Sequence, residues 1–258
     1  MGKLLEVFMK FVRYQSNGNV SYGTLSGDTI NEIDGDPITG YSETGNTVAL
    51  GDVKLLAPVT PGKVLAVGLN YRSHLGGAPE PANPEIFIKT PTCLNDPEGN
   101  IVLPAGDDNV HAEGELVVVI KNQTKGATPE EAAANILGVT CGNDVSARTW
   151  QSNDMQWWRA KASDTFGPVG PVVVTGLNYN ALQLETRING EVVQSQTTAD
   201  LIFPVEAVVS FVSQAMTLEP GDVIFTGTPG TTSALRASDV VEVELEGIGV
   251  LKNTVVDA

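Results

Sequence analysis

At 258 residues, 41% of them hydrophobic, the chain is long enough to bury a full hydrophobic core in one large domain with a small appendage. Its 31 acidic and 15 basic residues give a formal net charge of −16. This balance argues against a nucleic-acid partner, because phosphate binding needs clustered Lys and Arg, and the two cysteines form no CxxC pair that would indicate a zinc site.

Residues 1–58 have the pattern of a small β-rich domain. The stretch 1–14 is too short and too charged for a signal peptide or a membrane span, so we expect a cytoplasmic protein with no membrane partner. Short alternating segments separated by Gly, Asn and Asp predict strands. These segments are FMKFVRY (8–14), VSYGTL (20–25), DTINEIDG (28–35) and VKLLAPV (53–59).

A second domain is expected at 59–258, after the Pro- and Gly-containing joint PVTPGK (58–63). Its predicted strands show no alternation with helices, which favours a mainly β fold, a β-sandwich or rolled sheet with a few peripheral helices. The strand segments are KVLAVGLNY (63–71), EIFIK (85–89), ELVVVIK (115–121), GPVVVTG (170–176), LETRING (184–190), DVIFTGTPG (222–230) and VVEVELEGIGVL (240–251).

Two helices have clear boundary signals. Thr128, Pro129 and Glu131 have the spacing of a capping box with Pro in the first turn, and the helix is expected to run to Gly138 as its stop. A second helix is predicted from about Val205 to Met216, closed by a Glu-Pro-Gly-Asp turn at 219–222.

Glu113 and Glu115 stand out in HAEGELVVVI (111–120). Side chains alternate along a strand, so these two point to the same face. The residues that follow, 116–120, are all apolar, which predicts a strand covered on both faces with its leading acids near the interior. By contrast, VEVELE (241–246) alternates as a half-solvated strand does. Buried carboxylates need a partner.

Two kinds of partner are open for these acids. Arg148 and Lys161 are candidates for ion pairs, and a hard divalent cation is the alternative, because Mg²⁺, Mn²⁺ and Ca²⁺ prefer oxygen ligands. A third acid, Asp144 in CGNDVSARTWQ, follows 29 positions after Glu115 (144 minus 115). The spacing alone does not show whether the three acids meet.

Several separated motifs together resemble the fumarylacetoacetate hydrolase family, in its branch of acylpyruvases and 2-hydroxyhepta-2,4-diene-1,7-dioate isomerases. They occur in family order from about Lys63 to the carboxyl terminus, and residues 9–58 fit the small variable domain of many members. The motifs are VLAVGLNYRSH, EIFIKTP, HAEGELVVVI, GVTCGNDVSARTWQ, WRAKASDTFGPVGP, TRINGEVVQ and TLEPGDVIFTGTPG.

The resemblance implies a mixed β-sandwich roll, usually homodimeric, that holds Mg²⁺ or Mn²⁺, with Ca²⁺ as an ion that a crystal can contain instead. The implied metal ligands are Glu113, Glu115 and Asp144. The same comparison implies further roles, which are catalysis for Lys161 and His74, and substrate binding for Arg148, Gln151, Thr228 and Tyr71.

Family members act on 2-oxo or 2,4-dioxo acids, so the resemblance implies a metal-dependent hydrolase that breaks a carbon–carbon bond in an acylpyruvate-type acid through an enolate. Lys161 would stabilise the enolate oxygen, and Arg148 and Gln151 would hold the substrate carboxylate. In hydrolytic relatives, a histidine at the position of His74 activates water.

The residue that partners this histidine in the family pattern is missing from the present sequence. A glutamate normally follows that histidine by three residues, and here Gly77 stands in its place. Glu80 or Glu85 are candidate substitutes, or His74 acts alone. The gap also motivates two alternatives, a 2-oxo-dicarboxylate decarboxylase of the oxaloacetate type or a dienoate isomerase, neither of which needs activated water. A non-catalytic metal-binding protein is the third.

Overall fold

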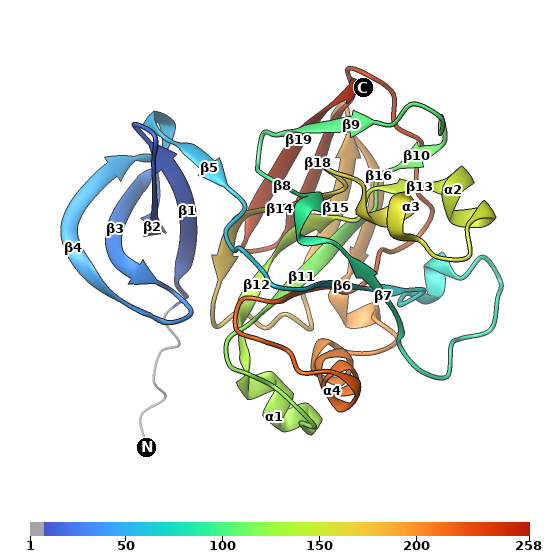
Figure 1. Cartoon of the computed structure of the whole chain (residues 1–258), viewed down its shortest axis with the longest axis horizontal. Helices are drawn as coiled ribbons and strands as arrows, with labels where there is room; N and C mark the ends of the chain where they lie inside the picture. The colour runs from blue at the N-terminus through green and yellow to red at the C-terminus, as the bar shows by residue number, and fades with distance from the viewer. Residues whose placement is uncertain (1–7) are drawn as a thin grey trace.

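The structure is a computed structural model that describes residues 8–258 (Figure 1). Residues 1–7 of the amino-terminal stretch considered above lie outside the described part. The strands of the small amino-terminal lobe form an antiparallel meander, and the last of them returns to pair with the first. They are β1 (Lys10–Ser16), β2 (Asn19–Ser26), β3 (Thr29–Asp36), β4 (Gly40–Ala49) and β5 (Lys54–Leu56).

The lobe and the larger part of the chain share one sheet. Lys10 and Phe11 of β1 pair with Val174 and Val173 of β14, so the order runs β4-β3-β2-β1-β14-β12-β11-β17-β6-β7. Figure 1 shows the lobe as the blue strands beside the main body. The remaining strands of this order are β6 (Val64–Gly68), β7 (Glu85–Lys89), β11 (Gly114–Ile120), β12 (Ile136–Asn143), β14 (Gly167–Val174) and β17 (Val223–Phe225).

A second sheet packs on the main sheet and makes the predicted sandwich. Its order is β16-β15-β18-β19-β9. Leu116 and Val118 of β11 share a buried cluster with Val243 of this second sheet, whereas Val117 belongs to a cluster with Val59 on the other face. Strand β11 is therefore covered on both faces, as the unbroken apolar run predicts. The strands of the second sheet are β9 (Asn100–Leu103), β15 (Gln183–Ile188), β16 (Glu191–Thr197), β18 (Val240–Leu245) and β19 (Gly249–Asp257).

The first predicted helix begins as expected and ends early. Thr128 and Glu131 form the capping box, and α1 covers Pro129–Ala134. The expected stop at Gly138 is wrong, because the chain continues from Ile136 as β12, a strand that the sequence patterns did not predict. A Cβ atom at Gly138 would lie 2.3 Å from the carbonyl oxygen of Val174. The glycine therefore allows β12 and β14 to approach closely, and it does not end a helix.

The second helix prediction is confirmed by α4 (Val205–Ala215), followed by the turn at 219–222. Two short helices that were not predicted, α2 (Arg148–Asn153) and α3 (Trp158–Ala162), carry three of the candidate site residues. No helix within residues 8–258 is long and apolar enough to cross a membrane. The shorter elements are η1 (Leu50–Asp52), η2 (Arg72–His74), η3 (Pro91–Cys93), η4 (Thr198–Asp200), β8 (Leu94–Asn95), β10 (Val110–His111) and β13 (Ser146–Ala147).

Candidate metal centre

The pairing of two central strands brings the three acids together. Strands β11 and β12 run antiparallel with Gly114 opposite Asn143, so the residue before one strand lies beside the residue after the other. The Asp144 amide donates a hydrogen bond to the carbonyl oxygen of Glu113 at 2.9 Å. One carboxylate oxygen from each of Glu113, Glu115 and Asp144 lies within 4.8 Å of the other two. All three acids are at most 3% exposed.

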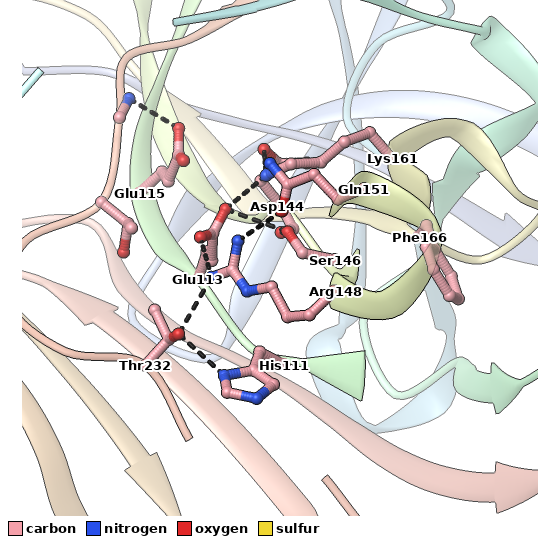
Figure 2. Close-up of polar contacts among 12 residues, drawn as sticks. His111, Glu113, Glu115, Asp144, Ser146, Arg148, Gln151, Lys161, Phe166 and Thr232 are labelled. Carbon is pink, nitrogen blue, oxygen red and sulfur yellow. Dashed lines mark hydrogen bonds and ion pairs between the residues drawn. The ribbon is translucent and has the colours of Figure 1, made fainter. Parts of the chain in front are cut away.

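Two basic side chains lie against these acids, as Figure 2 shows. Lys161 Nζ is 2.5 Å from Glu113 Oε2 and 2.7 Å from Asp144 Oδ2. Arg148 donates through Nη2 to Glu113 Oε1 and through Nη1 to Gln151 Oε1, the latter at 2.8 Å. The ion-pair partners that the sequence suggested are thus in place beside the same carboxylates that would hold a cation.

A second buried lysine, Lys89 at the end of β7, is a functional candidate that the sequence reasoning missed. Its Nζ atom donates to Asp144 Oδ1 at 2.7 Å, to the carbonyl oxygen of Phe166 at 3.1 Å and to that of Lys161. Lys89 is only 1% exposed. The signal was its position two residues after Phe87, which puts both side chains on one face of an apolar strand.

Burial and neighbouring charges shift the pKa values of Glu113, Glu115 and Lys161 in different directions. Burial raises the pKa of Glu115, and the negative charges of Asp144 and Glu113 raise it further, well above the ordinary range. Burial would also raise the pKa of Glu113, but the charges of Lys161 and Arg148 outweigh it and hold that pKa below its ordinary value. Burial alone would lower the pKa of Lys161, and Asp144 and Glu113 reverse this so that the pKa is raised.

The donor set therefore fits a hard divalent cation. Three buried carboxylates offer oxygen ligands, and burial together with repulsion from Asp144 and Glu113 raises the pKa of Glu115. A divalent ion among these oxygens would relieve that repulsion.

The loop at 226–230 supports the acids from the other side. The Gly227 amide donates to Glu115 Oε2 at 2.7 Å, and Thr228 Oγ1 donates to the carbonyl oxygen of Gly114 at 2.9 Å. Gln194, which the sequence reasoning did not single out, donates to Thr228 Oγ1 at 2.8 Å and accepts from the Gly114 amide at 3.1 Å. The only sequence signal for Gln194 was its place in the TRINGEVVQ motif.

A cavity of about 270 Å³ opens onto the acids. Its polar wall contains most of the predicted site residues, namely Glu113, Glu115, Asp144, His74, Arg148, Gln151, Lys161 and Thr228. Its apolar wall is formed by Val67, Leu69, Phe87 and Trp157. Tyr71 does not line this cavity. It is fully buried in the main core, and its hydroxyl has no hydrogen-bond partner among residues 8–258, so its substrate-binding role stays a prediction.

His74 lines the cavity, and within residues 8–258 its Nδ1 atom contacts a backbone carbonyl oxygen and no carboxylate. Its Nδ1 atom is 2.6 Å from the carbonyl oxygen of Gly230, and its Nε2 atom is 3.7 Å from Glu113 Oε1. Glu80 pairs with Arg72 instead, at 2.6 Å, and Glu85 is exposed at the start of β7. Neither of these glutamates replaces the one missing at Gly77.

Comparison with known proteins places this site in a family. Residues 63–256 match the model described as fumarylacetoacetate (FAA) hydrolase C-terminal, and residues 9–58 match the model described as Rv2993c-like, N-terminal. The chain belongs to the fumarylacetoacetate hydrolase family, whose members include isomerases, tautomerases and hydrolases.

Individual relatives are similar over most of their length. The chain is 42% identical to 5-carboxymethyl-2-hydroxymuconate delta-isomerase from Mycobacterium smegmatis, with a TM-score of 0.92 over 97% of this chain and 100% of that one. It is 42% identical to 2-hydroxyhepta-2,4-diene-1,7-dioate isomerase from Mycobacterium marinum, with a TM-score of 0.91 over 96% and 98%. It is also 41% identical to human oxaloacetate tautomerase FAHD2A, mitochondrial, over 80% of this chain and 70% of that protein.

Proposed function

We propose that this protein is a divalent-metal-dependent enzyme that converts small 2-oxo acids through their enolates. The leading reaction is hydrolysis of a carbon–carbon bond in an acylpyruvate-type 2,4-dioxo acid. The observation that carries the proposal is the buried acidic triad beside Lys161 at the floor of a cavity of about 270 Å³. The names of the relatives are those of isomerases and a tautomerase of 2-oxo acids or their enols, so they support the enolate chemistry but not hydrolysis in particular.

Glu113, Glu115 and Asp144 are the residues that would hold Mg²⁺ or Mn²⁺. When bound there, the ion supplies a Lewis acid for the carboxylate and 2-oxo oxygens of the substrate. This proposal rests on the convergence of three buried carboxylate oxygens and on the raised pKa of Glu115.

Lys161 is the group that stabilises negative charge developing on the substrate. It is 3% exposed, and the neighbouring acids raise its pKa, so it stays a cation in a site with little water. A fixed positive charge in such a site stabilises an enolate oxygen more strongly than it would in water.

Arg148 and Gln151 would hold the substrate's carboxylate. Both line the cavity, and Arg148 carries a planar fork of donors. Thr228 lies on the same wall. Its hydroxyl donates to the Gly114 carbonyl oxygen and accepts from Gln194, so a contact with a more distant substrate oxygen would require this hydroxyl to change partner. His74 is the base that takes a proton from water during hydrolysis.

The second candidate reaction is tautomerisation, isomerisation or decarboxylation of a 2-oxo acid, oxaloacetate included. The specific observation in its favour is that Gly77 replaces the expected glutamate and that Glu80 is bound to Arg72. These reactions need no activated water, so they tolerate the loss of a carboxylate behind His74.

One experiment separates the two reactions. Metal-stripped protein is incubated with acetylpyruvate or with oxaloacetate, with and without Mg²⁺, and pyruvate release and loss of the enol absorbance are followed. Magnesium-dependent release of pyruvate from acetylpyruvate is expected. Turnover of oxaloacetate alone would overturn the hydrolase assignment, and no turnover together with no magnesium-dependent binding of oxalate would overturn the enzyme proposal. We also propose a homodimer, which light scattering would test.

A further inference from the structure

Ser73 and His74, neighbours in η2 (Arg72–His74), both contact the backbone of Gly230. The Gly230 amide donates to Ser73 Oγ at 2.9 Å, and the carbonyl oxygen of the same residue lies 2.6 Å from His74 Nδ1. Ser73 Oγ in turn donates to Gln196 Oε1 at 2.6 Å, and Gln196 Nε2 donates to Asp200 Oδ2 at 2.9 Å. The histidine is therefore attached to the loop that also holds Glu115.

The contact at Nδ1 determines where the imidazole carries its proton. A carbonyl oxygen accepts hydrogen bonds and cannot donate them, so the Nδ1 atom of His74 must be the donor. A neutral imidazole has one N–H group, which leaves Nε2 with the lone pair. That atom is 3.7 Å from Glu113 Oε1, and His74 lines the cavity.

We propose that the Gly230 carbonyl orients His74 in place of the missing glutamate and holds it in the tautomer with Nδ1 protonated and Nε2 free toward the cavity. Ser73 is the positioning residue, because its bonds to the Gly230 amide and to Gln196 keep η2 in the register that this contact needs. Ser73 is outside the cavity lining, and its hydrogen bonds within the described residues go to Gly230 and Gln196. The tautomer is a property of the folded protein alone, whereas its use as a base rests on the proposed function.

The chain suits a direct spectroscopic test, because His74 and His111 are its only histidines. Protein labelled with ¹⁵N in the histidine rings is studied by long-range ¹H–¹⁵N correlation at a pH where both rings are neutral. His74→Gln identifies the signals that belong to His74. We expect the Nδ1 atom of His74 to give the signal of a protonated ring nitrogen and Nε2 that of an unprotonated one. The opposite pattern, or one averaged over both tautomers, would overturn the proposal.

Substitution of Ser73 tests the positioning role. In Ser73→Ala the His74 signals should move toward the average of the two tautomers, and kcat should fall about tenfold with a smaller change in KM, as for other lost partners that orient a functional group. Ser73→Thr, which keeps the hydroxyl, should restore the wild-type pattern. Ser42→Ala, at an exposed position of β4, is the matched control. A wild-type spectrum and rate in Ser73→Ala would refute the role.

Failure of this inference about His74 can be told apart from failure of the proposed function. Magnesium-dependent binding of oxalate, followed by the melting temperature, tests the metal centre without His74. If oxalate fails to bind while the expected tautomer is observed, the proposed function falls and the orientation of His74 stands. If oxalate binds and the tautomer is reversed, the present inference falls alone.

Discussion

Replacement of Glu115 by Gln should stabilise the metal-free protein at alkaline pH while it abolishes stabilisation by Mg²⁺. Burial and the charges of Asp144 and Glu113 raise the pKa of Glu115. A carboxyl group whose folded-state pKa is raised favours folding most below its unfolded-state pKa, and this contribution is lost as the pH rises through the folded-state pKa. The substituted amide would not titrate, and its oxygen would still accept the Gly227 amide hydrogen bond.

The size of the effect follows from the geometry of the acids. Two unit charges at most 4.8 Å apart repel by at least about 3.5 kcal/mol at an effective dielectric constant of about 20. Lys161 lies close enough to offset part of this repulsion. We therefore expect Glu115→Gln to raise the free energy of unfolding by about 1 to 3 kcal/mol once the wild-type carboxyl is ionised, and by much less at mildly acidic pH.

Urea unfolding of chelator-treated protein across a pH series measures this difference, with Glu43→Gln at an exposed position of β4 as the control. Added Mg²⁺ at about 100 times its dissociation constant should stabilise the wild type by about 2.7 kcal/mol and leave Glu115→Gln unchanged. A difference between the two proteins that shrinks as the pH rises would refute the reasoning. So would equal stabilisation of both by Mg²⁺, which would remove Glu115 from the ligand set.

Three further changes test other parts of the structure. Lys89→Met removes a buried partner of Asp144 and should lower the free energy of unfolding by about 3 to 5 kcal/mol; an unchanged urea midpoint would contradict this. His74→Ala should slow acetylpyruvate hydrolysis about 10²-fold to 10⁴-fold and spare oxaloacetate decarboxylation, whereas equal losses would mean that His74 only shapes the cavity. Gly138→Ala places a Cβ atom 2.3 Å from the Val174 carbonyl oxygen and should cost about 1 to 3 kcal/mol in thermal or urea unfolding; wild-type stability would exclude this close approach.

The elements that the sequence predicted correctly are those with local signals. The apolar run 116–120 identified β11, the capping box identified the start of α1, and the Glu-Pro-Gly-Asp turn at 219–222 marked the end of α4. Strand β12 was missed because Gly138 was interpreted as a helix stop. Tertiary packing is what requires glycine at these positions. Gly138 faces a neighbouring backbone, and a Cβ atom at Gly142 would lie 2.3 Å from Val117 Cγ2.

The sequence predicted those site residues that one strand aligns on the same face. It did not predict contacts between residues of distant segments. Alternation alone placed Glu113 and Glu115 on one face. Lys89 reaches Asp144 across 55 positions of sequence, and the Gly230 carbonyl reaches His74 across 156. No local pattern encodes such contacts. The available hint for Lys89 was a charged residue two positions after Phe87, on the same face of an apolar strand.

The charge balance of the cluster explains how so acidic a chain can receive an anionic substrate. The chain carries a formal net charge of −16, which repels anions at long range. In the cluster itself, three carboxylates face three cations, Lys89, Lys161 and Arg148, so the formal charges cancel (three minus three). Any divalent cation held by the acids leaves the cavity with a net positive charge. Charges act strongly in a buried, poorly hydrated space and weakly across solvent. For an anionic substrate inside the cavity, attraction by the positive charge there therefore outweighs repulsion by the negative charge of the whole chain.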